Sequence, residues 1–376
     1  MSTPHVAPAG TNLVGLRDHN AALVLGLLRG RPEGGSRVEL AAETGLTPQA
    51  VGKIVTRLLT DGTVEEAGQA ASTGGKPRTL LRLRPDAGCA VGVHLDRDEL
   101  TVLLVDLAGR PRYRRTVPVD TARGPAPTVE LIADQVRAAA TEAPPGARLL
   151  GVGAGCRGPL DHGSGVLHWF STFSSPHDPG TPGWDRFPLR DALAARLAGL
   201  PVVVDKDTNA AALTEAPGAA AAPGSGVAYI HLAGGLGAGL LLDGVVHRGA
   251  RTNAGEFGHQ TLLVDGPLCD CGNRGCLEAL CLAELRRADH AAAARLVGVG
   301  VANLVRVLDV DRVVLGGRVI LERPETYRAG VAEQLRERIP DARWQPVAVS
   351  VSTAGPWAVA AGAAELVLGP VFGRRA

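Results

Sequence analysis

The densest group of reactive side chains in this sequence is a set of three cysteines. Cys269, Cys271 and Cys276 lie within eight residues, and His259 precedes the first of them by ten positions. Thiolates and an imidazole suit a tetrahedral Zn²⁺ site, and a set of four protein ligands leaves no open coordination position. We therefore predict a structural Zn²⁺ ion held by these side chains. Three reduced thiols beside a packed histidine are the alternative that the residues leave open.

A second group of side chains has the chemistry to bind DNA. Gln49, Lys53 and Arg57 recur at helical spacing, on the outer face of a predicted helix, and Thr47 caps that helix. Glutamine can read adenine, whereas lysine and arginine can read guanine or hold phosphate. We predict that these four residues contact double-stranded DNA. A small helical hairpin with a solvated, charged face is the alternative.

Three short helices are expected to position these side chains. Apolar residues at helical period predict the first helix over residues 20–29. A capping box predicts the second over residues 36–44, and Thr47 with the proline after it predicts the third over residues 47–60. Gly45 makes a tight corner between the last two helices, which is typical of a helix-turn-helix.

A two-stranded wing is predicted directly after these helices. Residues 64–66 and 80–83 have strand character, and a glycine-rich turn joins them. Residues 73–84 contain four basic side chains and no acidic one, and Lys76 and Arg78 lie in the turn. Positive charge at a wing tip suits contact with phosphates or the minor groove. The net charge of the whole chain is only +1, so a DNA footprint must be local.

A chain-breaking segment at residues 85–88 marks the predicted domain boundary. Residues 1–86 are expected to form the winged helix-turn-helix domain, and residues 87–376 a second domain of α/β class, because strand-like and helix-like segments alternate there. The expected strands cover residues 89–95, 100–106, 113–119, 149–154, 202–204, 227–232, 240–243 and 313–317, and the expected helices cover residues 128–140 and 189–197. Residues 234–239 are expected to form a glycine-rich loop.

The second domain resembles the ROK family of repressors, open reading frames and sugar kinases. The resemblance is carried by residues 255–259, residues 269–278 and the glycine segment 234–249, and it extends over about residues 10–370. The N-terminal third resembles the repressor branch of that family. The resemblance implies an actin-like fold of two lobes with a ligand cleft between them, a carbohydrate-type effector, and a homodimer or higher homo-oligomer.

The resemblance also implies which residues bind the ligand. Asp207 stands where the family's kinases have their general base, and Glu256, His259 and Glu278 match the family's other sugar contacts. Lys206 replaces an asparagine that binds a sugar hydroxyl in the family. A lysine beside an aspartate favours an anionic ligand such as a sugar acid or sugar phosphate. A surface Lys–Asp pair is the alternative.

Two loops of the family are recognisable by their position. Residues 155–159 resemble the loop along one wall of the cleft. Residues 171–184 correspond to the sugar-side loop, and their length and three prolines predict a reshaped specificity loop.

The segments that bind ATP phosphates in the family's kinases are altered here. His94 replaces the aspartate of an Asp-x-Gly-Gly-Thr turn, and residues 96–98, Asp-Arg-Asp, replace its Gly-Gly-Thr. Two carboxylates are then expected where phosphate should bind, and Gly234 replaces the usual threonine of the second phosphate loop. Because phosphoryl transfer depends on positioning and charge stabilisation, we predict that the protein is not an enzyme.

Composition places the chain among ordinary globular proteins, with 45% hydrophobic and 20% charged residues. Residues 1–10 lack the pattern of a signal peptide. The longest stretch without Asp, Glu, Lys or Arg, residues 216–242, is broken by prolines and glycines, which favours a buried strand and loop over a membrane helix. We expect a cytoplasmic protein with no membrane partner.

The leading hypothesis is a DNA-binding transcription regulator, expected to be a repressor of sugar-related genes, that responds to a ligand in the cleft. A sugar kinase with an appended DNA-binding domain is the second hypothesis. The third is a regulator whose second domain serves only as a dimerisation scaffold.

Overall fold

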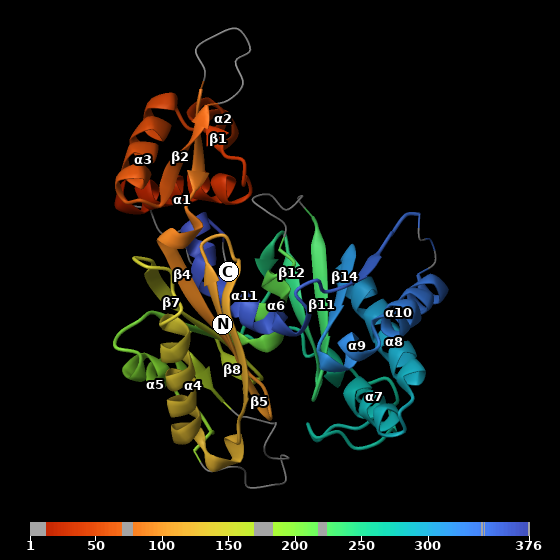
Figure 1. Ribbon diagram of the computed structural model, residues 1–376. Helices are drawn as coiled ribbons and strands as arrows, with labels where there is room; N and C mark the ends of the chain where they lie inside the picture. Colours follow the sequence, from red (N-terminus) through yellow and green to blue (C-terminus); the bar gives the residue numbers. More distant parts are fainter. Residues whose placement is uncertain are drawn as a thin grey trace, which may run out of the picture.

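The structure is a computed structural model that describes residues 13–69, 78–168, 183–216, 224–339, 341 and 343–374. Figure 1 shows an N-terminal helical unit above two lobes that lie side by side, each built around its own sheet.

The N-terminal unit combines three helices with a small antiparallel sheet in the order β1-β3-β2. Its elements are α1 (Leu13–Arg29), β1 (Gly35–Ser36), α2 (Arg37–Thr44), α3 (Pro48–Thr60), β2 (Val64–Gln69) and β3 (Thr79–Leu83). The predicted caps are confirmed, because Ser36 and Glu39 form a reciprocal capping box and the Thr47 hydroxyl accepts the Ala50 N–H. Gly45 has the positive φ, 69°, that the corner between α2 and α3 requires. The expected start of the first helix was wrong, because α1 begins seven residues before residue 20.

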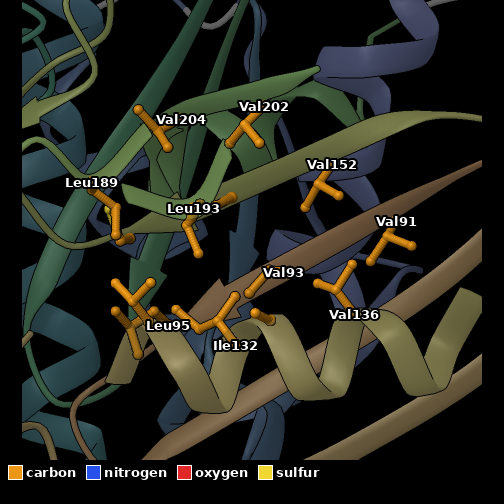
Figure 2. Packing of buried hydrophobic residues seen from close by; sticks show 14 of the residues in the cluster. Val91, Val93, Leu95, Ile132, Val136, Val152, Leu189, Leu193, Val202 and Val204 are labelled. Atoms are coloured by element: carbon orange, nitrogen blue, oxygen red, sulfur yellow. The ribbon is translucent and has the colours of Figure 1, made fainter. Parts of the chain in front are cut away.

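The first lobe contains a five-stranded sheet in the order β10-β7-β4-β5-β6. Its elements are β4 (Gly88–Leu95), β5 (Glu99–Asp106), β6 (Pro111–Pro118), α4 (Pro125–Ala140), β7 (Arg148–Cys156), α5 (Leu189–Arg196) and β10 (Val202–Lys206), with the short pair β8 (Leu160–Asp161) and β9 (Val166–Leu167). Apolar side chains from β4 meet Ile132 and Val136 of α4 and Leu193 of α5 in one buried cluster (Figure 2). The expected strands of this lobe are all present.

The second lobe contains another five-stranded sheet, in the order β13-β12-β11-β14-β15. Its elements are β11 (Gly226–Leu232), β12 (Leu236–Leu242), β13 (Val245–Val246), α7 (Leu277–Arg286), α8 (His290–Leu308), β14 (Arg312–Gly316), α9 (Arg318–Glu322), α10 (Pro324–Arg338) and β15 (Ala348–Val351). The expected loop at residues 234–239 was wrong in part, because β12 already begins at Leu236. Its glycines serve close packing: a Cβ on Gly239 would lie 2.0 Å from the Thr208 carbonyl oxygen.

Two helices, α6 (Asp207–Leu213) and α11 (Ala358–Leu368), lie between the two sheets (Figure 1). The backbone of α11 approaches β4 and β7 so closely that a Cβ on Gly92 or Gly153 would lie 1.8 Å from a helix carbonyl oxygen. The C-terminal end of α11 then meets the N-terminal unit, where Leu368 and Phe372 share one buried cluster with Leu28 of α1. The last helix of the chain therefore contacts both lobes and the helix-turn-helix unit.

Two helical stretches, His290–Leu308 and Gly355–Phe372, are long and apolar enough to span a membrane by length and composition. Both pack within the fold. Val297 and Val301 of α8 are fully buried in the core of the second lobe, and the second stretch contains α11. Core packing accounts for the apolar character of both stretches.

Candidate ligand cleft, metal centre and DNA-binding face

The four predicted metal ligands come together in the loop before α7. The short 3₁₀ turn Phe257–His259 presents the histidine, and Cys276 is the residue before the first turn of α7. One ligand atom from each of His259, Cys269, Cys271 and Cys276 lies within 4.8 Å of the others. Three sulfur atoms and one imidazole nitrogen at this separation fit a Zn²⁺ site of the closed, structural kind.

The fold of the loop depends on close backbone contacts around these ligands. A Cβ on Gly275 would lie 1.6 Å from the Leu263 carbonyl oxygen, and its φ is +67°. Burial raises the pKa of Cys269 to about 12 and also raises the pKa of Cys276. Because zinc binds thiolates, loading the site would release protons from these thiols.

A cleft of about 650 Å³ lies between the lobes, next to this loop. The five predicted ligand-binding residues line it: Lys206, Asp207, Glu256, His259 and Glu278. The residue after Cys276 begins α7, and the Glu278 carboxylate in the first turn accepts the Leu236 N–H at 2.6 Å. The metal loop and the cleft are therefore one continuous structure.

Lys206 does not form the surface pair with Asp207 that was the alternative expectation. Its side chain is only 6% exposed, and its Nζ donates to Glu256 Oε1 at 2.5 Å and to the Ala254 carbonyl at 3.1 Å. The partner lies 50 residues away in the sequence, on the second lobe. The positive charge of Lys206 is thus compensated inside the cleft.

A second ion pair, which the sequence did not reveal, joins the lobes at the residue before Lys206. Asp205 on β10 is fully buried, and its carboxylate accepts two hydrogen bonds from Arg248 at 2.6 and 2.8 Å. Asn209 donates to the same carboxylate at 2.9 Å. Arg248 follows β13 within the glycine segment 234–249 that carries the family resemblance, but nothing in that segment indicated a partner on β10.

The altered turn after β4 was predicted to place two carboxylates at the phosphate position. Asp96 lines the cleft. Burial acts to raise its pKa, but His94, the Arg97 N–H and Arg157 together lower the pKa below the usual value, so the carboxylate is ionised. The prediction for Asp98 was wrong. It is not among the described residues that line the cleft, and its Oδ2 lies 3.8 Å from Nη1 of Arg318.

The exposed face of α3 presents the predicted base-reading residues. Gln49, Lys53 and Arg57 are exposed, whereas Val51 and Val55 on the opposite face are buried. Thr47 is used as the cap of this helix. The face therefore combines a hydrogen-bonding amide with two cations on a rigid helix.

The wing carries less free charge than its sequence indicates. Arg78 is exposed, but Arg82 donates to Glu65 on the paired strand at 2.6 Å, and Arg84 lies 3.9 Å from the same carboxylate. Lys76 and the specificity loop, apart from residues 183–184, lie outside the described residues.

Comparison with known proteins identifies the family to which this two-lobed architecture belongs. A model of the ROK family matches residues 90–285. The chain belongs to the ROK family. This confirms the resemblance drawn from the glycine segment and the Cys/His loop, and with it the expected actin-like pair of lobes.

Individual relatives include regulators and kinases. The xylose repressor of Caldicellulosiruptor bescii is 29% identical over 244 residues, which cover 65% of this chain and 59% of that protein. A ROK hexokinase from Thermus thermophilus is 33% identical, with a TM-score of 0.58, and the match covers 73% of this chain and 96% of the hexokinase. A ROK transcriptional regulator described as a homologue of the E. coli MLC protein shares the fold over 95% of this chain and 97% of its own, with a TM-score of 0.73 at 22% identity.

Proposed function

We propose that this ROK-family chain is a DNA-binding transcription regulator, acting as a repressor of sugar-related genes, whose cleft binds a carbohydrate-type effector. Residues 1–86 serve as the winged helix-turn-helix domain and residues 87–376 as the sensor domain. The observation that carries the proposal is the shared buried cluster through which α1 and the end of α11 join a DNA-binding face to a two-lobed cleft.

Binding to operator DNA is assigned to both parts of the N-terminal unit. Gln49, Lys53 and Arg57 enter the major groove, and Lys76 and Arg78 of the wing hold the backbone or the minor groove. The protein acts as a homodimer or higher homo-oligomer, so the operator contains two half-sites related by a dyad. A regulator of this kind works in the cytoplasm.

Effector binding is assigned to the cleft. Asp207, Glu256 and Glu278 have carboxylate oxygens that accept hydrogen bonds from sugar hydroxyls, and Lys206 fixes the position of Glu256. An effector changes DNA binding only if it binds the two states of the protein with different affinities. A Zn²⁺ ion at the Cys/His set stabilises the loop that presents Glu278.

A sugar kinase is the second candidate, favoured by the retained Asp207 and by the likeness to a ROK hexokinase. Against it, the turn after β4, which binds ATP phosphate in the family's kinases, has the ionised Asp96 in place of a glycine, so that turn would repel an ATP phosphate. We propose that the chain does not catalyse phosphoryl transfer.

The test is a DNA-binding titration with the full chain on its own promoter region and on scrambled DNA, with and without a panel of sugars. Lys53→Ala should weaken binding, whereas Arg343→Ala, which removes an equal charge from a side chain 95% exposed on the second lobe, should not. Equal binding of both DNAs by the parent would refute the regulator. DNA binding that no sugar affects would favour the scaffold hypothesis.

A further inference from the structure

The cleft contains a half-buried arginine whose guanidinium donors are unused. Arg157 follows the last residue of β7 and lines the cleft. It forms no hydrogen bond and no ion pair with any residue that the structure describes. A planar guanidinium with free donors is suited to hold a carboxylate or phosphate through two parallel hydrogen bonds.

A glycine turn lies directly against this side chain. A Cβ on Gly235 would lie 2.3 Å from Arg157 Nη2, and a Cβ on Gly234 would lie 3.2 Å from Nη1. Neither glycine donates its backbone N–H to another backbone group in the described chain. Consecutive free N–H groups beside a guanidinium form a concave site for an anion.

Two more polar atoms at this end of the cleft lack partners. Thr208 Oγ1 and His231 Nδ1 are buried without a hydrogen bond to any described residue, and both residues line the cleft. The Thr208 side chain belongs to a residue only 4% exposed. Because buried polar groups are nearly always paired, these atoms indicate that a polar ligand group completes the site.

The carboxylates near Arg157 accept hydrogen bonds from backbone N–H groups and not from its guanidinium, although Arg157 is close enough to lower the pKa of Asp96. Asp96 accepts the Arg97 N–H at 2.7 Å, and Glu278 accepts the Leu236 N–H at 2.6 Å, so both carboxylates are oriented by the backbone. Lys206, the other cation of the inner cleft, is already paired with Glu256. Of these two described cations, Arg157 rather than Lys206 therefore has donors that an anionic ligand could use.

We propose that the effector carries an anionic group, a carboxylate or a phosphate, and that Arg157 binds this group against the turn at residues 234–235. The inference rests on the proposed effector function and specifies the ligand class. Hydroxyls of the same ligand face Asp207 and Glu278, and the Glu278 carboxylate also lies beside Gly235.

The test measures ligand affinity by thermal shift and calorimetry on the full chain. Glucose is compared with glucuronate and glucose 6-phosphate, xylose with xylonate, and inorganic phosphate is tested alone. At least one anionic sugar should bind about tenfold or more tightly than its neutral parent, because a charge-assisted hydrogen bond is lost in the neutral ligand. Comparison of the sugar acids with the phosphate probes shows whether the site prefers a carboxylate or a phosphate.

Variants then assign the preference to one side chain. Arg157→Gln should weaken the anionic ligand about 10- to 100-fold and leave the neutral sugar unchanged. Arg157→Lys, which keeps the charge without the planar fork, should give an intermediate loss. Arg97→Gln, a change of the same type at another cation lining the cleft, should leave the preference intact.

Three results would overturn the inference: equal affinity for a sugar and its anion, a preference that survives Arg157→Gln, or no binding of any anionic probe. Unchanged melting temperature and DNA affinity of unliganded Arg157→Gln would show that it is folded. If only a neutral sugar releases the protein from DNA, the anionic site is contradicted and the regulator function still holds. If the protein binds an anion but no DNA, the regulator function is contradicted and the anionic site still holds.

Discussion

An ion pair lies at the joint between the DNA-binding unit and the lobes, beside their shared buried cluster. Arg29 at the end of α1 donates two hydrogen bonds to Glu365 of α11, at 2.5 and 2.8 Å, and the two side chains are only 9% and 15% exposed. The Arg29 guanidinium also lies 4.5 Å from the centre of the Phe372 ring. We predict that Glu365→Gln destabilises the protein and loosens this joint.

The magnitude follows from the burial and the number of bonds. A hydrogen bond to a charged group contributes about 1.5–3 kcal/mol, and removing one partner of a buried pair leaves the other charge uncompensated. Glutamine can keep one of the two bonds, while Arg374, 3.8 Å from Glu365, adds a second cation that loses its partner. We therefore expect the free energy of unfolding to fall by about 2 kcal/mol.

The assay is urea denaturation of Glu365→Gln, Arg29→Met and the double variant, with the coupling energy taken from the cycle. Glu325→Gln breaks an exposed ion pair with Arg328 and should leave the denaturation midpoint unchanged. A coupling energy below about 0.5 kcal/mol, the size typical of a surface pair, would show that Arg29 and Glu365 do not hold the joint.

Three further predictions concern the metal, the chemistry and the DNA. Elemental analysis should find one zinc per chain, and Cys276→Ser should lower the melting temperature; a metal-free protein as stable as the loaded one would contradict the site. No hexose should be phosphorylated with ATP above background, and turnover that Asp207→Asn abolishes would disprove the loss of kinase chemistry. Gln49→Ala should relax the preference at one operator position by about 1–3 kcal/mol, whereas Lys76→Ala should weaken binding to all sequences and reduce the salt slope by about 0.9; variants that bind both DNAs like the parent would exclude this DNA-binding surface.

Features that depend on neighbours in the chain could be predicted from the sequence. The capping box at Ser36, the cap at Thr47 and the turn at Gly45 each involve residues three or four positions apart, so their residue types identify them directly. The Cys/His set could be recognised in the same way, because its three cysteines lie within eight residues. Alternation of strands and helices gave the α/β class, although it did not reveal that β12 extends into the glycine segment, because glycines indicate a loop unless a neighbouring backbone requires them.

The tertiary structure determines which charged side chains of the cleft are paired with each other. Lys206 lies beside Asp207 in the sequence, yet its partner is Glu256, because the end of β10 faces the second lobe across the cleft. Arg157 belongs to the loop expected along one wall of the cleft, but only the fold showed that its side chain lies against Gly235. The sequence alone determines which residue types are available and the local elements that hold them. Which charge meets which depends on long-range packing of two sheets around α6 and α11, and no local pattern encodes that packing.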